Sequence, residues 1–368
     1  MSNSPSREQW QQLYTLADRI KALAPWNNLF EDDLFGVRDP VTGEDCFISV
    51  MGQGGDHYAI GIYVGALALH QFWAVHDVDD EEMAMQMLLA IRQLQLAFED
   101  REMLENFDRA VIKQVGRKYR GRAAWPTFRS FKPGYLPWQI DSTEADLLIR
   151  VLEQATEVLA RAADDETLLE PVDEDSYLMR IPETQAEGIV WREQIMKIPP
   201  PPIPELEIAL DAMQLEAARK LPKQKQRTLE VDIATLPEPI IGEDGRPFLA
   251  SLLLVVDNQS GMVLASELLP QGETPMHTIA GALQMLLDKF TQWGWLPSAV
   301  NVRHDIAKEL LAPLTDALKI KLKVARNLSM LDEALEFLFA RFGGQMLEEL
   351  DDDQGDDAPP PIHHRGSR

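Results

Sequence analysis

The sequence has a single cysteine, Cys46, in 368 residues. An internal disulfide is therefore excluded, and with it a small secreted domain held by disulfides. No apolar run approaches the roughly 20 residues that a membrane-spanning helix needs. The first ten residues, MSNSPSREQW, lack the basic and then apolar segments of a secretory signal. These absences predict a soluble protein of the cytoplasm that has no membrane partner.

Basic residues are scarce relative to acidic ones. The chain has 35 lysines and arginines against 60 aspartates and glutamates, which gives a formal net charge of −25. Such a surface repels phosphate backbones, so the composition argues against a general nucleic-acid-binding protein. Apolar residues nevertheless make up 45% of the chain, which is enough to build folded cores. The length favours two domains.

A proline-rich stretch divides the chain. PPPPIP occupies 199–204, and four consecutive prolines form a stiff polyproline II spacer. We therefore expect an N-terminal domain over 1–198, a linker with a connecting helix over 199–227, and a C-terminal domain over 228–345. The remaining residues, 346–368, carry acidic runs and three prolines, a composition typical of a disordered tail.

The N-terminal part has the pattern of an α+β domain with an antiparallel sheet. Strand-like segments at 34–38, 46–51 and 58–64 are separated by the turn sequences DPVTG and GQGGD, as in a meander. Because GQGG leads into a strand-like segment and not into a helix, it predicts a hairpin turn in preference to a phosphate loop. Helical spacing of apolar residues covers 80–98, where methionines are frequent, and 142–163.

One stretch departs from the acidic average. Between residues 109 and 140 there are eight basic residues, no acidic residue and six interleaved aromatic residues. Arginines among aromatics are typical of sites that hold phosphates and stack bases. The candidate binding residues are Arg117, Arg120, Arg122, Trp125, Arg129, Lys132, Tyr135 and Trp138. The alternative is an irregular, proline-marked loop whose aromatics anchor packing and whose arginines pair with surplus carboxylates. The acidic composition of the whole chain favours this alternative.

From residue 228 onward the predicted elements follow a regular order: three strands, then helix, strand, helix, strand and helix. This βββαβαβα order over 228–342 resembles the ribonuclease H-like fold, in its integrase and transposase branch. The resemblance implies an α/β domain with two divalent metal ions, Mg²⁺ or Mn²⁺, held by acidic side chains. The matching positions are Asp232 in LEVDI, Asp305 in VNVRHD, and Glu333 or Glu336 in LDEALEF.

The candidate acids also have structural interpretations. In the family the second aspartate is usually followed by Asn and Gly, whereas Ile306 and Ala307 stand here. Asp305 directly precedes a segment with helical periodicity, so it is equally placed to act as an N-cap. Glu333 and Glu336 lie in a predicted helix, where acidic side chains are usually solvated.

The chain as a whole resembles a bacterial two-domain family built from domains of unknown function. The resemblance rests on LAPWNNLFEDDLFGVRDPVTG and FRSFKPGYLPW in the N-terminal half. It covers nearly all of the chain outside the acidic tail and implies no particular activity.

Two functions are compatible with these features. The first is a non-catalytic interaction or regulatory protein with no cofactor, whose partner is another protein. The alternative is a Mg²⁺-dependent nuclease or strand-transfer relative, with Asp232 and Asp305 as metal ligands and the stretch at 109–140 holding nucleic acid. The acidic surface and the departure after Asp305 favour the first. Neither predicts a particular oligomeric state.

Overall fold

The computed structural model describes residues 4–352, apart from 77, 79–86, 166, 171–172, 174, 187, 201–209, 237, 243–244, 271–274 and 326. The chain divides into two compact units. Unit 1 consists of Met1–Pro204 together with Glu243–Pro247, and unit 2 consists of Glu205–Gly242 together with Phe248–Arg368. Within the described residues, no helix is both long enough and apolar enough to cross a bilayer.

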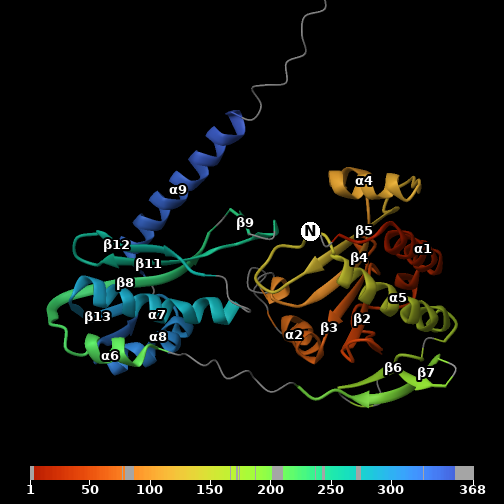
Figure 1. The fold of residues 1–368 in the computed structure, drawn as a ribbon, viewed down its shortest axis with the longest axis horizontal. Coiled ribbons are helices and arrows are strands. Elements are labelled where there is room, and N and C mark those ends of the chain that lie inside the picture. The colour runs from red at the N-terminus through yellow and green to blue at the C-terminus, as the bar shows by residue number, and fades with distance from the viewer. Residues whose placement is uncertain are drawn as a thin grey trace, which may run out of the picture. The chain divides into compact units, whose positions relative to one another are not determined.

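Unit 1 is built on a seven-stranded sheet with the order β5-β4-β3-β2-β1-β6-β7 (Figure 1). The strands are β1 (Phe35–Arg38), β2 (Asp45–Met51), β3 (Tyr58–Val64), β4 (Gln93–Glu99), β5 (Trp125–Phe131), β6 (Ser176–Gln185) and β7 (Gly188–Lys197). All neighbours pair antiparallel except β1 and β6, which are parallel. The predicted antiparallel pairing is therefore confirmed for every pair except β1 and β6, whose parallel pairing makes the sheet mixed.

Helices cover both faces of this sheet because its strands are apolar on both sides. Ile48 and Ile62 pack into one core with α1 (Arg7–Leu23) and α5 (Ser142–Ala162). Their chain neighbours Phe47 and Tyr63 point the other way, into a second core with α2 (Ala66–His76). This alternation is the two-residue period of a strand. The shorter helical elements of unit 1 are η1 (Pro25–Asn27), η2 (Arg101–Met103) and α4 (Asn106–Gln114).

Two predictions in unit 1 are wrong in part. The segment expected to be a helix over 80–98 contains strand β4 from Gln93 onward, and its residues 80–86 lie outside the described ones. Leu94, Leu96 and Phe98 alternate toward the α1 and α5 core, so the period is two and not 3.6. The stretch expected to be an irregular loop over 109–140 instead supplies the end of α4 and the whole of β5.

Unit 2 contains a five-stranded sheet with the order β12-β11-β8-β13-β14. The strands are β8 (Lys223–Thr235), β11 (Ser251–Asp257), β12 (Val263–Leu268), β13 (Leu296–Val302) and β14 (Lys321–Val324), and the helices are α6 (Ala212–Ala218), α7 (Pro275–Trp293), α8 (Asp305–Ala317) and α9 (Ser329–Asp352). β8 pairs antiparallel with β11 and parallel with β13, and β13 pairs parallel with β14. A separate two-stranded sheet is formed by β9 (Ile240–Ile241) and β10 (Pro247–Phe248).

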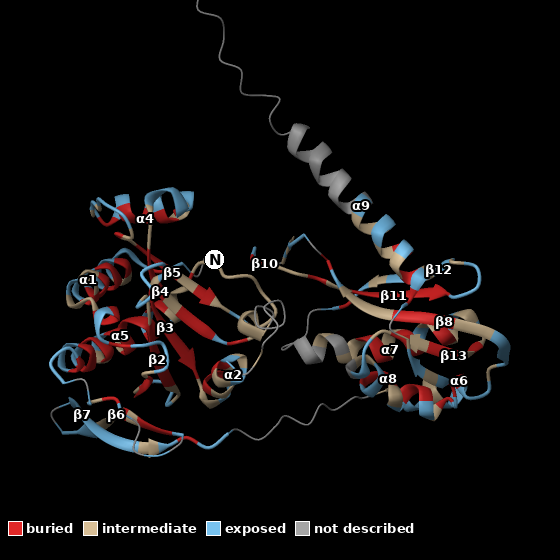
Figure 2. Cartoon of the chain, turned by 180° about the vertical axis from the view of Figure 1, so that it is seen from behind, coloured by how far each residue is buried: buried red, intermediate tan, exposed pale blue. Residues whose placement is uncertain are grey.

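The sheet of unit 2 also has two apolar faces, and the buried strands are visible in Figure 2. Leu253 and Val255 of β11 pack with α7 and α8, whereas Leu254 and Val256 pack with α9. Helix α9 runs to Asp352, beyond the domain end predicted at 345, and 353–368 lie outside the described residues. The face covered by α9 is the one that carries the predicted acidic site.

Candidate functional site

The predicted acidic site lies on the central strand of unit 2. Asp232 of β8 accepts a hydrogen bond from Arg303, whose Nε lies 3.1 Å from its Oδ2. Arg303 directly follows β13, and its Nη2 donates to Oδ1 of Asp332 in the first turn of α9. The Asp232 side chain is 14% exposed, that of Arg303 24% and that of Asp332 42%. One guanidinium therefore joins two carboxylates from different elements at the edge of the α9 core.

The positive charge of Arg303 offsets part of the negative charge of Asp232 and Asp332. The hydrogen bond to Asp332 raises the pKa of Arg303 above its ordinary value, against the opposing effect of burial, and the bond to Asp232 adds to the rise. Arginine does not lose its proton in proteins at accessible pH. The site therefore holds a permanent cation between two acids.

The other predicted ligands are exposed and belong to helices α8 and α9. Asp305 is exposed and is the first residue of α8, whose N-cap is His304, so the expectation that Asp305 caps this helix is wrong. Glu333 and Glu336 are exposed on α9. Among the residues that the structure describes, no group of three or more His, Cys, Asp or Glu side chains is placed to hold a metal ion.

Glu230 is a buried acid that the sequence reasoning missed. It is 2% exposed, and its Oε2 accepts a hydrogen bond of 2.9 Å from the backbone N–H of Leu331 at the start of α9. Its other oxygen accepts from the side-chain amide of Asn258. A signal was available, since Glu230 and Asp232 alternate with Leu229 and Val231, which face the opposite core. Two acids on one face of a central strand indicate polar partners on that face.

The basic stretch of unit 1 is partly neutralised. Arg117 pairs with Asp18 and donates to the Thr15 hydroxyl over 2.7 Å. Arg129, whose side chain is 16% exposed, makes two hydrogen bonds of 2.6 and 2.8 Å to the Asp108 carboxylate.

The remaining predicted binding residues are two exposed arginines, one lysine and three aromatic residues. Arg122 lies 3.8 Å from Asp100, with 86% of its side chain exposed, and Arg120 is exposed. Trp125 contacts Tyr119 edge-on at 5.9 Å between ring centroids. The Lys132 ammonium lies over the Tyr135 ring at 4.8 Å, and the Trp138 backbone pairs with that of Ser130.

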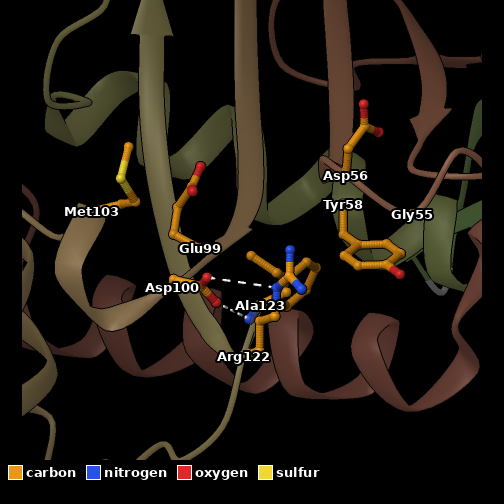
Figure 3. Close-up of a pocket in the computed structure, with 9 residues that line it drawn as sticks. Gly55, Asp56, Tyr58, Glu99, Asp100, Met103, Arg122 and Ala123 are labelled. Carbon is orange, nitrogen blue, oxygen red and sulfur yellow. Dashed lines mark hydrogen bonds and ion pairs between the residues drawn. The ribbon is translucent and has the colours of Figure 1, made fainter.

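Three hollows follow this stretch and differ in charge. The first, of about 350 Å³, is lined by Arg101, Arg109, Ile112, Lys113, Gly116, Arg117, Lys118 and Trp125, with no acidic residue. The second, of about 540 Å³, shares Arg101 and Trp125 with it and adds two acidic residues, Asp100 and Glu102, and two basic ones, Arg120 and Arg122. The third, of about 440 Å³, is shown in Figure 3, where Asp100 faces Arg122 and Glu99 and Asp56 also line the space. The charged residues of the lining thus change from basic only in the first hollow, through a mixture in the second, to mainly acidic in the third.

The two signature segments of the N-terminal half have structural roles. In DPVTG, the buried Asp39 carboxylate accepts from Arg150 of α5 over 2.6 and 3.1 Å and from the backbone and hydroxyl of Thr42 over 2.9 and 2.8 Å. In FRSFKPGYLPW, the Ser130 hydroxyl donates to Glu144 over 2.6 Å. Both segments are therefore tied to α5.

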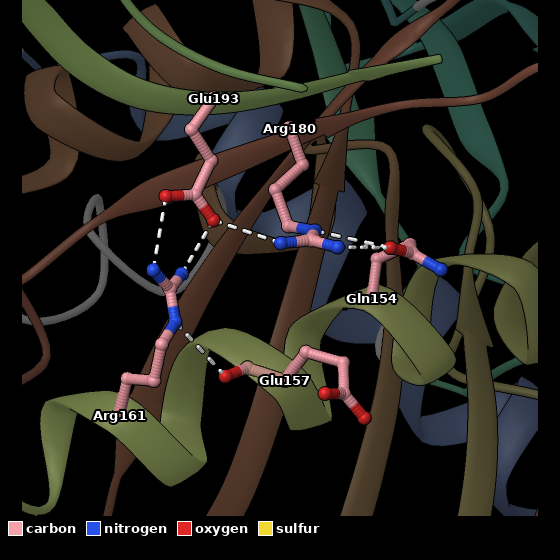
Figure 4. Close-up of polar contacts among 5 residues, drawn as sticks. All are labelled: Gln154, Glu157, Arg161, Arg180 and Glu193. Atoms are coloured by element: carbon pink, nitrogen blue, oxygen red, sulfur yellow. Dashed lines mark hydrogen bonds and ion pairs between the residues drawn. The ribbon is translucent and has the colours of Figure 1, made fainter. Parts of the chain in front are cut away.

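A third polar cluster joins α5 to the edge hairpin of β6 and β7 (Figure 4). Arg180 donates to Glu193 over 2.8 Å and to the side-chain carbonyl of Gln154, while Arg161 donates to the same glutamate. Burial raises the pKa of Glu193, but the hydrogen bonds from Arg161 and Arg180 outweigh this effect and hold the pKa below its ordinary value. The cluster contains a glutamate already engaged by two arginines, so it serves to fix the hairpin.

Comparison with known proteins gives two family matches, one in each half. Residues 10–180 match the domain of unknown function DUF7309, and residues 214–339 match the domain of unknown function DUF6930. No curated protein and no solved structure matches the chain. The predicted resemblance to a family built from two domains of unknown function is confirmed. The chain therefore contains two domains of unknown function, one in each half.

Proposed function

We propose that unit 2 is a ribonuclease H-like domain. The proposal is supported by the chain order of its sheet: β8, β11 and β12 come first and pair antiparallel, with β8 at the centre. The helix-linked strands β13 and β14 then extend the sheet parallel to β8. Helix α9 packs on the face of β8 that carries Asp232. The resemblance assigns the metal-binding acids to Asp232, Asp305 and Glu333 or Glu336, and Asp332 is the chain neighbour of Glu333.

The protein acts, in this proposal, as a non-catalytic interaction or regulatory protein of the cytoplasm. The observation that carries it is the position of Arg303, which engages Oδ2 of Asp232 and Oδ1 of Asp332 together. Two-metal catalysis requires such carboxylates to bind the ions directly. Because the guanidinium is tethered to the end of β13 and stays protonated, it neutralises the acids without supplying an activated water.

The partner in this proposal is another protein. A net charge of −25 opposes long-range association with a polynucleotide. The single cysteine is buried and suits a reducing compartment.

A nuclease assay tests the proposal directly. The full chain would be incubated with single-stranded DNA, duplex DNA, RNA and an RNA–DNA hybrid, each with Mg²⁺ and with Mn²⁺. We expect the substrates to remain intact. Cleavage that Asp232→Asn abolishes would show a working metal site and overturn the proposal.

Mn²⁺ binding, followed by electron paramagnetic resonance, tests the role of Arg303. We expect Arg303→Ala to bind more Mn²⁺ than the wild type, because Asp232 and Asp332 lose their shared cation. The matched control is Arg227→Ala, which removes an arginine from the single carboxylate of Asp257 in the same unit. Equal Mn²⁺ binding by all three proteins would contradict the view that the guanidinium occupies a latent cation site.

A further inference from the structure

The hollow of about 350 Å³ in unit 1, whose charged lining residues are all basic, is here called the basic cleft. The proposed function assigns no role to these residues. Arg109 and Lys113 lie four residues apart on α4 and so project from the same side of the helix. Lys118 follows α4, and Arg101 belongs to η2. Trp125, at the start of β5, supplies an aromatic side chain to the lining, and Ile112 supplies an aliphatic one beside the cations. Three separate elements therefore direct cations into one small space.

Four of the five cations that line the basic cleft have no acidic partner among the described residues. Arg117 is paired with Asp18, but Arg101, Arg109, Lys113 and Lys118 form no ion pair there. Arg109 has only long contacts, of 3.4 Å to the Asn106 side chain and 3.5 Å to a backbone carbonyl. Elsewhere most arginines of this acidic chain do have carboxylate partners. A group of unpaired like charges in a cleft repels itself, and a bound anion removes that repulsion.

The size and surroundings of the cleft select a compact anion. Its volume of about 350 Å³ falls within the ordinary range of small-molecule sites. At physiological salt, charges act over roughly 8 Å, so a ligand inside the cleft feels mainly the local cations. The second hollow mixes basic and acidic residues, and a long polynucleotide that continued into the third would meet Asp56, Glu99 and Asp100, which would repel its phosphates. The lining therefore favours two or three linked phosphates over a polymer.

We propose that the basic cleft binds a phosphate ester of nucleotide size. Its phosphates contact Arg109, Lys113 and Lys118, and its planar base packs against Trp125, whose ring already carries the Arg101 guanidinium at 5.9 Å. Arginine beside an aromatic wall is suited to a ligand with both phosphate and ring. This inference concerns unit 1 alone and does not depend on the proposal for unit 2.

Isothermal titration of the full chain at low salt tests the inference with three probes: ATP, inorganic tripolyphosphate and a short single-stranded DNA. We expect ATP to bind more tightly than tripolyphosphate, and DNA to bind most weakly. Lys113→Glu with Lys118→Glu should weaken ATP and tripolyphosphate binding at least about tenfold. The matched control is Lys321→Glu with Lys323→Glu, which changes the same residue type and net charge on the exposed strand β14. It should leave both affinities within about twofold.

Three results would overturn the inference. The first is no measurable binding of ATP or tripolyphosphate by the wild type. The second is an equal loss in the control, which would mean that total charge and not the cleft governs binding. The third is DNA binding tighter than ATP and lost with Lys113 and Lys118, which would assign the cleft to polynucleotides. Circular dichroism of both double variants verifies that they fold.

Discussion

Replacement of Asp39 by alanine should strongly destabilise unit 1. Asp39 follows β1, and its side chain is fully buried, whereas that of Arg150 is 26% exposed. The substitution removes the acceptor of two bonds from Arg150 and two from Thr42. It leaves a guanidinium, a backbone N–H and a hydroxyl without their partner at the junction of the sheet with α5.

The magnitude follows from the burial of the pair. Removal of one partner of a buried ion pair costs about 3–5 kcal/mol, mostly because the other charge remains desolvated. Since Arg150 is partly exposed, water can solvate part of its guanidinium, and we expect about 3 kcal/mol for Asp39→Ala. Asp39→Asn keeps the shape and the capacity to accept from Thr42 but loses the charge, so about 2 kcal/mol is expected.

Urea denaturation at pH 7, followed by tryptophan fluorescence, measures these losses. The control is Glu157→Ala, which removes a carboxylate that lies 3.5 Å from Arg19, with both side chains more than half exposed. Such a surface pair contributes at most about 1 kcal/mol. If Asp39→Ala lost no more stability than this control, the reasoning about the buried pair would be refuted.

The pH dependence of the Asp39 effect has a definite sign. Burial raises the pKa of Asp39, but the hydrogen bonds from Arg150 and Thr42 outweigh this effect and hold the pKa below its ordinary value. A lowered folded-state pKa contributes stability above the unfolded-state pKa of about 3.9, and that stability disappears as the pH falls through the folded value. The gap between wild type and Asp39→Asn should therefore narrow in acid, and a constant gap would contradict the pKa assignment.

Three further substitutions or reactions test other contacts. Glu230→Ala should lower the free energy of unfolding by about 2 kcal/mol in urea titrations, because the buried N–H of Leu331 loses its acceptor; an unchanged midpoint would contradict this. Burial raises the pKa of the Cys46 thiol, so a thiol reagent should react only after unfolding, and rapid labelling of the native protein would be the contrary result. Burial raises the pKa of Asp257, but the hydrogen bonds to its carboxylate, that from Arg227 foremost, together outweigh this effect and hold that pKa below its ordinary value. Asp257→Asn should therefore cost more stability at pH 7 than at pH 3, and equal losses at the two pH values would contradict this assignment.

The parts of the fold that were predictable carry strong local signals. The segments at 34–38, 46–51 and 58–64 agree with β1, β2 and β3, because proline and glycine mark the turns between them. Helix α5 (Ser142–Ala162) agrees with the expected 142–163, and the Asp141 side chain caps its first turn. Each of these elements is specified by residues next to it in the chain.

The errors lie where distant segments decide the structure. Methionines and leucines at helical spacing precede β4 and predict a helix, but pairing with both β3 and β5 fixes β4 as a strand. The parallel pairing of β1 with β6 joins Phe35 to Leu178, a contact that no local pattern indicates. In the basic stretch, Arg117 and Arg129 do pair with carboxylates, as the favoured interpretation expects, but the partners Asp18 and Asp108 lie outside the stretch and no local pattern identifies them.

The acidic site shows the same limit and the reason for it. The resemblance to the ribonuclease H-like fold singles out Asp232, but Arg303 lies 71 residues away along the chain, and Asp332 lies 29 residues beyond that. Two carboxylates held close together on a half-buried face repel each other unless a cation lies between them. A divalent ion and a guanidinium both meet this electrostatic requirement, so acids in the expected order do not by themselves indicate catalysis. The informative residue is the one that follows the β13 strand: a basic side chain there can neutralise the acids from within the protein, which is the arrangement that Arg303 provides.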